Sequence, residues 1–212
     1  MNEDSEYHLR ELAVARSADD PRRVMPEIPD GARRVLDIGC GAGQTLVASD
    51  LKGAGAFGID YDFSALQMGK SLGANVSLVQ ATGERLPFAD RSFDFVFSRV
   101  ALPYMRIPPA LREIARVLVP GGRIWLSLHS LKMASWSHAL SNPRRTAYEI
   151  YKLLNTAALH FGSSQYRYPL AKRRTESYQT TAGIRRALTR AGFTEIEIRR
   201  GAFFIVSAKK GE

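Results

Sequence analysis

Short apolar runs alternate with longer amphipathic stretches along most of the 212-residue chain. Each apolar run ends at a glycine or a polar residue, as expected for a buried strand. Between the runs, apolar residues recur about every three or four positions, which indicates helices with one buried face. This alternation predicts an α/β fold built on a parallel sheet.

The pattern assigns each element to a residue range. Strands are expected at residues 35–38, 56–60, 75–80, 92–99, 123–128, 195–200 and 203–209. Helices are expected at residues 5–16, 44–48, 63–68, 108–118, 148–159 and 184–191. A chain of 212 residues is long enough for a single domain, residues 1–212, with a full hydrophobic core.

Residues 1–30 form a helical leader before the first strand. This leader can lie over the binding site as a lid, with Tyr7 or His8 reaching in. It can also pack as a helix on the edge of the sheet. An aromatic residue at helical spacing usually belongs to the core, which favours the sheet edge.

The first strand runs directly into a glycine-rich turn at residues 39–43. Glycine has no Cβ, so the backbone can turn sharply there and approach a ligand closely. The helix at 44–48 then presents free backbone N–H groups to that ligand. A dinucleotide fingerprint needs its third glycine one position later, at Gln44. The spacing therefore disfavours an NAD-dependent oxidoreductase, which stays an alternative.

The second strand ends in a carboxylate that suits a nucleoside. Asp60 lies 60 − 39 = 21 positions after Gly39, where an acid can accept hydrogen bonds from both ribose hydroxyls. Tyr61 can stack on or edge the adenine ring. Asp62 and Ser64 are better placed than Asp60 to cap the helix that follows, which leaves Asp60 for the ligand.

Three motifs together carry a resemblance to a known family. They are Asp-x-Gly-x-Gly-x-Gly at residues 37–43, Leu-Pro-Phe followed by Ser-Phe-Asp within 86–94, and Glu-Ile-Ala-Arg-Val-Leu-x-Pro-Gly-Gly at 113–122. In these motifs the chain resembles the class I S-adenosylmethionine (SAM)-dependent methyltransferases, with a methyltransferase type 11-like domain. The resemblance covers residues 33–128 by motif and 180–209 by pattern.

The resemblance implies a Rossmann-like, seven-stranded sheet in the order 3-2-1-4-5-7-6, with strand 7 antiparallel. It also implies SAM as the methyl donor and S-adenosylhomocysteine as the product. The glycine turn would pass the methionine part, and Asp37 would help to hold its amino group. Asp60 would take the ribose, and the loop after the third strand would hold the adenine.

The cofactor residues implied in this way are Asp37, Gly39, Cys40, Gly41, Gly43, Asp60, Tyr61, Thr82, Gly83, Glu84, Ser98 and Arg99. Ser98 and Arg99 would line the exit of the methyl group. Family members usually carry an aspartate where Thr82 stands. The Thr82 hydroxyl can still accept a hydrogen bond from the adenine amino group.

Methyl transfer from a sulfonium needs little side-chain chemistry, because the donor is already activated. A general base is needed only if the acceptor must first lose a proton. His129, at the end of the fifth strand, is the best-placed candidate, followed by His138 and Tyr104. A lone histidine more often has a structural role.

Residues 130–179 differ from the rest of the chain and are expected to form a helical insertion that caps the substrate. They hold seven aromatic residues, and eight Lys or Arg against two Glu, so that 8 − 2 = +6 of the net charge of +9 lies here. A basic, aromatic cap suits an acidic or aromatic small-molecule acceptor. A lipid or quinone precursor at a membrane surface, or RNA, stays an alternative acceptor.

Other features of the composition bear on where the protein works and on whether it binds a metal. No apolar run approaches the roughly 20 residues that span a membrane, and the acidic start is not a signal peptide. Cys40 is the single cysteine, which excludes an intrachain disulfide and fits the cytoplasm. The histidines show no zinc-ligand spacing, so no metal is expected. A non-catalytic SAM-binding module stays a further alternative, although the intact acids and glycines argue against it.

Overall fold

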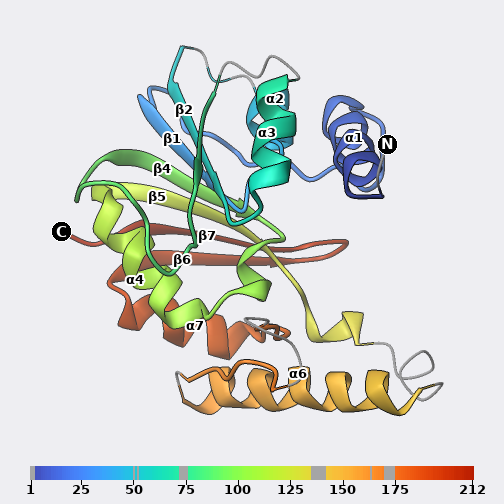
Figure 1. Ribbon diagram of the computed structural model, residues 1–212. Helices are drawn as coiled ribbons and strands as arrows, with labels where there is room; N and C mark the ends of the chain where they lie inside the picture. Colours follow the sequence, from blue (N-terminus) through green and yellow to red (C-terminus); the bar gives the residue numbers. More distant parts are fainter. Residues whose placement is uncertain are drawn as a thin grey trace.

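A seven-stranded sheet forms the centre of the computed structural model, which describes residues 3–49, 51, 53–71, 76–134, 142–162, 164–169 and 175–212 (Figure 1). The strand order is β3-β2-β1-β4-β5-β7-β6. Strand β7 runs antiparallel to both of its neighbours, and the other pairs are parallel. The predicted fold class, strand order and antiparallel strand are confirmed. The strands are β1 (Arg34–Ile38), β2 (Gly55–Asp60), β3 (Ser77–Gln80), β4 (Phe93–Arg99), β5 (Leu118–Leu128), β6 (Phe193–Arg200) and β7 (Phe204–Lys210).

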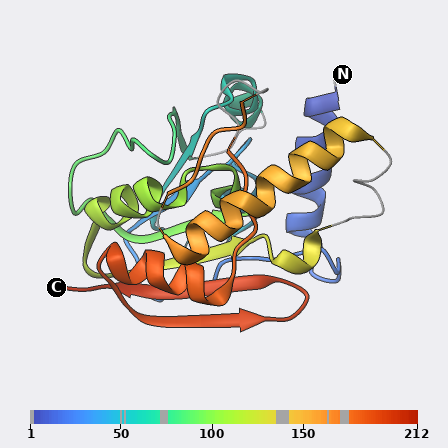
Figure 2. The ribbon, with the colours of Figure 1, turned by 90° about the horizontal axis from the view of Figure 1, so that it is seen from below.

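Helices cover both faces of the sheet. In Figures 1 and 2, α1, α2 and α3 lie on one side, α4 and α7 lie on the other, and α6 lies beyond α7. Two short 3₁₀ helices, η1 and η2, follow β4 and β5. The helices are α1 (Glu3–Arg16), α2 (Gln44–Ala48), α3 (Phe63–Ser71), η1 (Leu102–Tyr104), α4 (Ile107–Val117), η2 (Leu131–Met133), α6 (Pro143–Phe161) and α7 (Thr181–Arg190).

The larger of two apolar cores lies between the sheet and the pair α4 and α7. There Leu36, Val96 and Leu126 of the sheet share one cluster with Ile114 of α4 and Leu188 of α7. Each fully buried side chain of this kind stabilises the fold by about 1.5–3 kcal/mol. A smaller cluster lies on the opposite face of the sheet. The two clusters hold the central strands rigidly from both sides.

Of the element boundaries that differ from the expectation, two have clear local causes. Strand β5 begins at Leu118 rather than at residue 123, because Leu118 already pairs with Phe93 across a register shift. Helix α6 begins at Pro143, ahead of residue 148, because the Asn142 side chain accepts a hydrogen bond from the Arg144 N–H and caps it. Asn75, the expected start of the third strand, lies outside the described residues.

The sheet places a crevice at the carboxyl ends of β1 and β4. The chain leaves β1 through α2 toward β2, and it leaves β4 through α4 toward β5, so the two connections diverge onto opposite faces. Ligands of open α/β sheets bind at such a switch point. Of the described helices, none is both long and apolar enough to cross a membrane.

Gly69 provides a test of how tightly α3 packs. Alanine normally stabilises a helix interior by about 1 kcal/mol relative to glycine. Here a Cβ at Gly69 would lie 2.6 Å from the Ala42 carbonyl oxygen and 2.7 Å from Leu78 Cδ1. We therefore expect Gly69→Ala to lower the free energy of unfolding by about 1–3 kcal/mol in urea denaturation. Gln67→Ala, at an exposed position of the same helix, should change it by less than about 0.5 kcal/mol. Equal effects of the two substitutions would contradict close packing at Gly69.

Candidate functional site

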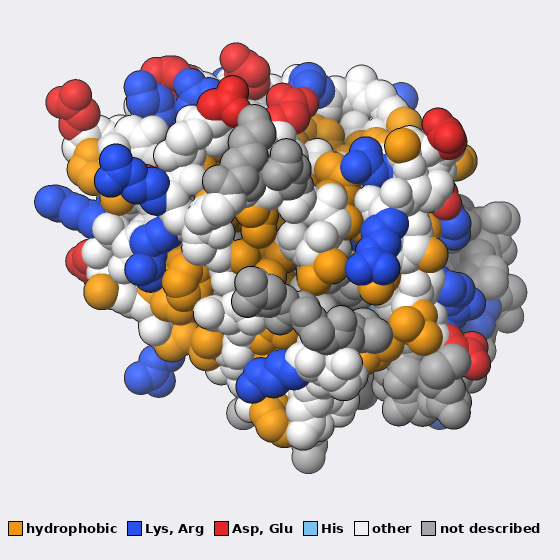
Figure 3. All heavy atoms as spheres, turned by 90° about the horizontal axis from the view of Figure 1, so that it is seen from above, with side chains coloured by type: hydrophobic (Ala, Val, Ile, Leu, Met, Phe, Trp, Pro, Cys, Tyr) orange, Lys and Arg blue, Asp and Glu red, His pale blue; other side chains and the backbone are white. Residues whose placement is uncertain are grey.

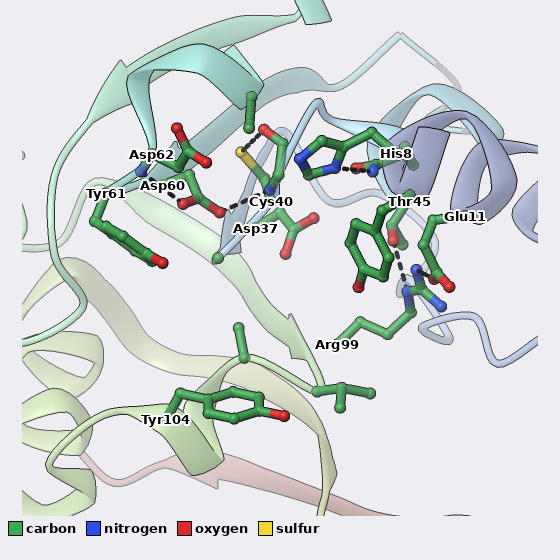
Figure 4. Close-up of a pocket in the computed structure, with 17 residues that line it drawn as sticks. His8, Glu11, Asp37, Cys40, Thr45, Asp60, Tyr61, Asp62, Arg99 and Tyr104 are labelled. Atoms are coloured by element: carbon green, nitrogen blue, oxygen red, sulfur yellow. Dashed lines mark hydrogen bonds and ion pairs between the residues drawn. The ribbon is translucent and has the colours of Figure 1, made fainter. Parts of the chain in front are cut away.

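A pocket of about 340 Å³ opens at the carboxyl ends of β1, β2 and β4 (Figure 4). Its lining comes from the glycine turn, the exits of β2 and β4, η1 and the leader helix α1. The lining residues are Tyr7, His8, Glu11, Asp37, Gly39, Cys40, Gly41, Gln44, Thr45, Asp60, Tyr61, Asp62, Ala65, Arg99, Val100, Ala101 and Tyr104. This volume falls in the range of small-molecule and cofactor sites.

The glycine turn forms one wall of the pocket. The N–H groups of Gly39 and Cys40 both donate to the Ile59 carbonyl oxygen, at 2.8 and 2.9 Å, and so tie the turn to β2. Gly39 has a φ of 76°, and a Cβ there would lie 2.1 Å from the Cβ of Ala101. Only glycine fits a position that needs both a left-handed backbone and this close approach.

The Asp60 carboxylate lies beside the turn. Its Oδ2 accepts from the Gly41 N–H at 2.8 Å, and its Oδ1 accepts from the Asp62 N–H at 2.9 Å. These two bonds fix the carboxylate at the mouth of the pocket (Figure 4). Asp62 accepts from the Ser64 N–H at 2.9 Å at the start of α3, so the capping role falls to Asp62 as the sequence indicates.

Asp37 carries a buried acceptor without a partner. Only 2% of its surface is exposed, and among the described residues nothing donates a hydrogen bond to its Oδ1. Burial raises the pKa of this carboxyl to about 8; Arg99 opposes the shift and Asp60 adds to it. Burying an unpaired acceptor is costly. The site therefore suits a cation or a hydrogen-bond donor of a ligand.

The leader helix α1 supplies a further wall. Tyr7 and His8 line the pocket, and His8 Nδ1 lies 2.8 Å from Gln44 Nε2 on α2. The leader thus reaches the pocket, which is the less favoured of the two arrangements considered from the sequence. Whether it opens and closes as a lid stays a prediction.

An ion pair joins α1 to the end of β4. Arg99 donates to the Glu11 carboxylate at 2.5 Å and, through Nε, to Thr45 Oγ1 at 3.1 Å. These side chains are partly buried, so the pair is less screened than a surface pair. Arg99 thus holds α1, α2 and β4 together beside the pocket.

Seven of the twelve implied cofactor residues line this pocket, namely Asp37, Gly39, Cys40, Gly41, Asp60, Tyr61 and Arg99. The other five are not among the described lining residues: Gly43, Thr82, Gly83, Glu84 and Ser98.

Ser98, Glu84 and Gly43 have defined places within the fold. Ser98 is fully buried, donates to the Ile38 carbonyl oxygen at 2.9 Å and accepts from the Leu102 N–H at 3.2 Å. Glu84 accepts from the Arg106 N–H at 3.1 Å. Gly43 stands in the left-handed conformation, with a φ of 77°, directly before α2.

His129 lies behind the pocket rather than in its lining. Its ring meets the ring of Tyr104 edge-on, with centroids 5.2 Å apart, and Tyr104 lines the pocket. Burial lowers the pKa of His129, the Glu176 charge raises it and the Lys152 charge lowers it further. The lowered pKa favours a neutral imidazole that can accept a proton. His138 lies outside the described residues.

The insertion turns several of its polar groups inward. Lys152 Nζ lies 2.7 Å from the Tyr178 hydroxyl, 2.9 Å from Glu149 and 3.8 Å from Glu176. Lys152 therefore serves this internal network, although the sequence counts it among the bases that could attract an acidic acceptor. Of the aromatic and basic residues in the expected cap, four lie outside the described ranges: Trp136, Lys172, Arg173 and Arg174.

Sequence reasoning missed part of the pocket. Gln44 and Thr45 line it, and their place directly after the glycine turn is a signal that could have indicated them. Val100 and Ala101 also line it. Val100 has a φ of 63°, a strained conformation for a β-branched residue. Such strain collects at functional sites, yet nothing in the sequence around Val100 indicates it.

Comparison with known proteins agrees with this geometry. Residues 36–126 match the family model of a methyltransferase domain. The chain is 32% identical over 133 residues to a demethylmenaquinone methyltransferase of Renibacterium salmoninarum, covering 62% of this chain and 53% of that protein. It is 30% identical over 177 residues to a demethylmenaquinone methyltransferase of Corynebacterium glutamicum, covering 82% of this chain and 73% of that protein.

Among solved structures, a SAM-dependent methyltransferase from Mesorhizobium loti has a TM-score of 0.62 and 22% identity over 97% of this chain and 98% of that one. At this identity the likeness concerns the fold. The chain spans about half the length of the Renibacterium relative, and 40% of the length of an uncharacterized methyltransferase of Bacillus subtilis that it also matches.

The buried Asp37 predicts a pH-dependent stability. Its pKa is about 8 in the folded protein, against about 3.9 in an unfolded chain. Between these values the folded state holds a proton that the unfolded state releases, so the free energy of unfolding falls as pH rises. In Asp37→Asn this contribution is absent. Urea denaturation at about pH 5 and about pH 8 should show the wild type losing about 2–4 kcal/mol more than the variant. Parallel pH profiles would show that Asp37 titrates normally.

Proposed function

Because the chain belongs to the class I SAM-dependent methyltransferases, we propose that it transfers the methyl group of SAM to a small-molecule acceptor and leaves S-adenosylhomocysteine. The observation that carries the proposal is the pocket itself. It combines a tight glycine turn, the positioned carboxylate of Asp60 and the buried Oδ1 of Asp37, to which no described residue donates a hydrogen bond.

The residues present fit the charges of SAM. The orphaned Oδ1 of Asp37 supplies the acceptor that an ammonium group requires. Asp60 uses one lone pair of each oxygen on backbone N–H groups and keeps others for ribose hydroxyls. Tyr61 is exposed at the mouth, where a ring can cover the adenine. For Thr82, Gly83 and Glu84, support for an adenine contact comes from the family resemblance alone.

SAM supplies an activated methyl group, so the task of the chain is to orient the acceptor and exclude water. Val100, Ala101 and Tyr104 form the apolar side of the pocket next to the insertion. An aromatic or apolar acceptor suits this side better than a strongly polar one. The names of the two curated relatives, demethylmenaquinone methyltransferases, support an aromatic, quinol-type ring as the first acceptor to test.

His129 is the base that we propose for an acceptor that must lose a proton. Its lowered pKa favours a neutral imidazole at physiological pH, and its ring packs edge-on against Tyr104, which lines the pocket. His129 therefore serves an acceptor bound on the insertion side of the pocket.

Titration calorimetry with SAM and S-adenosylhomocysteine tests the cofactor assignment. We expect the wild type to bind both compounds and Asp60→Asn to bind each at least about tenfold more weakly, because an amide replaces two acceptor oxygens with one. Asp19→Asn, at an exposed position of the loop after α1, is the matched control and should bind as the wild type does. Folded wild type that binds neither compound would refute the proposal, and a preference for NADH would favour an oxidoreductase.

Turnover tests the acceptor side. With a reduced demethylmenaquinone of short prenyl chain, His129→Gln should lower the rate of methyl transfer by about 10²-fold or more while leaving the SAM dissociation constant unchanged. The wild-type rate should fall at acid pH, through a pKa below the ordinary histidine value of about 6.5. Tyr104→Phe keeps the ring contact and should retain most of the rate. Full activity of His129→Gln would exclude this base, and SAM binding without transfer to any acceptor would favour a non-catalytic module.

A further inference from the structure

Helix α6 exposes a row of apolar side chains to solvent. At 3.6 residues per turn, residues spaced alternately by three and four positions share one side of a helix. The exposed residues with that spacing are apolar throughout: Pro143, Ala147, Ile150, Leu154, Ala157 and Phe161, hereafter the apolar stripe. Leu154 is 65% exposed and Phe161 is 79% exposed. A helix that packs on a core normally turns such a stripe inward.

The buried side of the same helix carries Tyr151 and Leu159 together with three polar residues, Lys152, Asn155 and Thr156. Asn155 Nδ2 donates to the carbonyl oxygens of Tyr166 and Glu176, at 2.9 and 3.1 Å. Thr156 Oγ1 accepts from the Tyr178 N–H at 3.0 Å. Rotating α6 to bury the stripe would break these hydrogen bonds and take the Lys152 ammonium away from Tyr178 and Glu176. The fold itself therefore holds the stripe outward.

In the described part of the insertion, the exposed charged side chains are all basic. Lys132, Arg144 and Arg167 are exposed. The acids in the described part of the insertion, Glu149 and Glu176, have side chains only 13% and 9% exposed, and both face Lys152. The opposite side of the molecule, over α2 and α3, carries acidic and basic side chains together (Figure 3).

A partner that matches this surface must be both apolar and anionic. A second copy of the chain would match the apolar stripe but would bring further cations and no exposed acid from the same face. A lipid surface offers both parts, because its phosphates can meet the cations while its acyl region accepts the stripe. Leu131 and Met133 on η2 are also exposed and extend the apolar area beyond α6.

We propose that α6 docks the protein on an anionic lipid surface, with the apolar stripe at the boundary of headgroups and acyl chains. The helix has 19 residues and is about 28 Å long. It lies at the surface of the molecule, below α7 in the view of Figure 1, and is not one that could cross a membrane. Docking of this kind is parallel to the membrane plane. Its measurement requires no methyl transfer and so stands apart from the proposed function.

Co-sedimentation of the full chain with lipid vesicles tests the docking. One set of vesicles contains phosphatidylglycerol and phosphatidylcholine, and the other contains phosphatidylcholine alone. We expect binding to the anionic vesicles, at least about fivefold weaker binding to the zwitterionic ones, and a loss of binding as salt is added.

Matched variants locate the surface. Leu154→Glu should weaken binding to anionic vesicles by about tenfold or more, because an acid replaces an apolar side chain at the centre of the stripe. Phe63→Glu, at an exposed apolar position at the start of α3, should leave binding unchanged. Arg144→Glu should weaken binding at least about fivefold, whereas Lys70→Glu on α3 should not. Circular dichroism and SAM titration of each variant show that the fold and the pocket are intact.

Three outcomes would overturn the proposal. The first is failure of the folded wild type to bind anionic vesicles. The second is an equal loss of binding in Leu154→Glu and Phe63→Glu, which would place the contact elsewhere. The third is a concentration-dependent dimer that Leu154→Glu dissociates while vesicle binding is absent, which would make the stripe an interface between two copies of the chain.

Discussion

The close approach of the glycine turn to the start of η1 is the constraint on which the site depends. The Gly39 position leaves no room for a Cβ beside Ala101, and one carbonyl oxygen, that of Ile59, receives two N–H groups of the turn. These contacts bring the ends of β1, β2 and β4 to a single point. The carboxylates of Asp37 and Asp60 take their places in the pocket from that meeting of strands. A wider turn would move these two carboxylates apart, and the pocket would no longer form.

The strand order and seven of the residues that line the pocket could be predicted from the sequence, because both depend on local signals. Each strand is a short apolar run, and the glycine turn with its acids has a fixed spacing. Ser98 could not be placed in this way. It stands at the end of β4, where the family resemblance implies a place at the exit of the methyl group. Its hydroxyl instead donates to the Ile38 carbonyl oxygen and accepts from the Leu102 N–H. Which side of a strand end faces a ligand depends on η1, whose position the sequence does not reveal.

The leader and the insertion show a second limit of sequence reasoning. Tyr7 at helical spacing favoured a packed helix, yet it lines the pocket, because Glu11 and Arg99 hold α1 there. In α6 the apolar period is clear, but period alone does not say which side faces the core. Buried partners for Lys152 and Asn155, distant in sequence, decide the orientation. Interactions between polar groups far apart in the chain thus control the parts that the hydrophobic pattern leaves open.

The buried carboxyl of Asp37 also makes the pocket a point of proton exchange. At neutral pH this group holds a proton in the empty pocket, because its pKa is about 8. A cationic ligand that pairs with the carboxylate displaces that proton, so each binding event releases acid to the surroundings. The occupancy of the site is then coupled to the acidity of the solution, and the heat of binding changes with the ionisation enthalpy of the buffer. A single unpaired oxygen at the end of β1 thereby links the filling of the pocket to the proton balance around the protein.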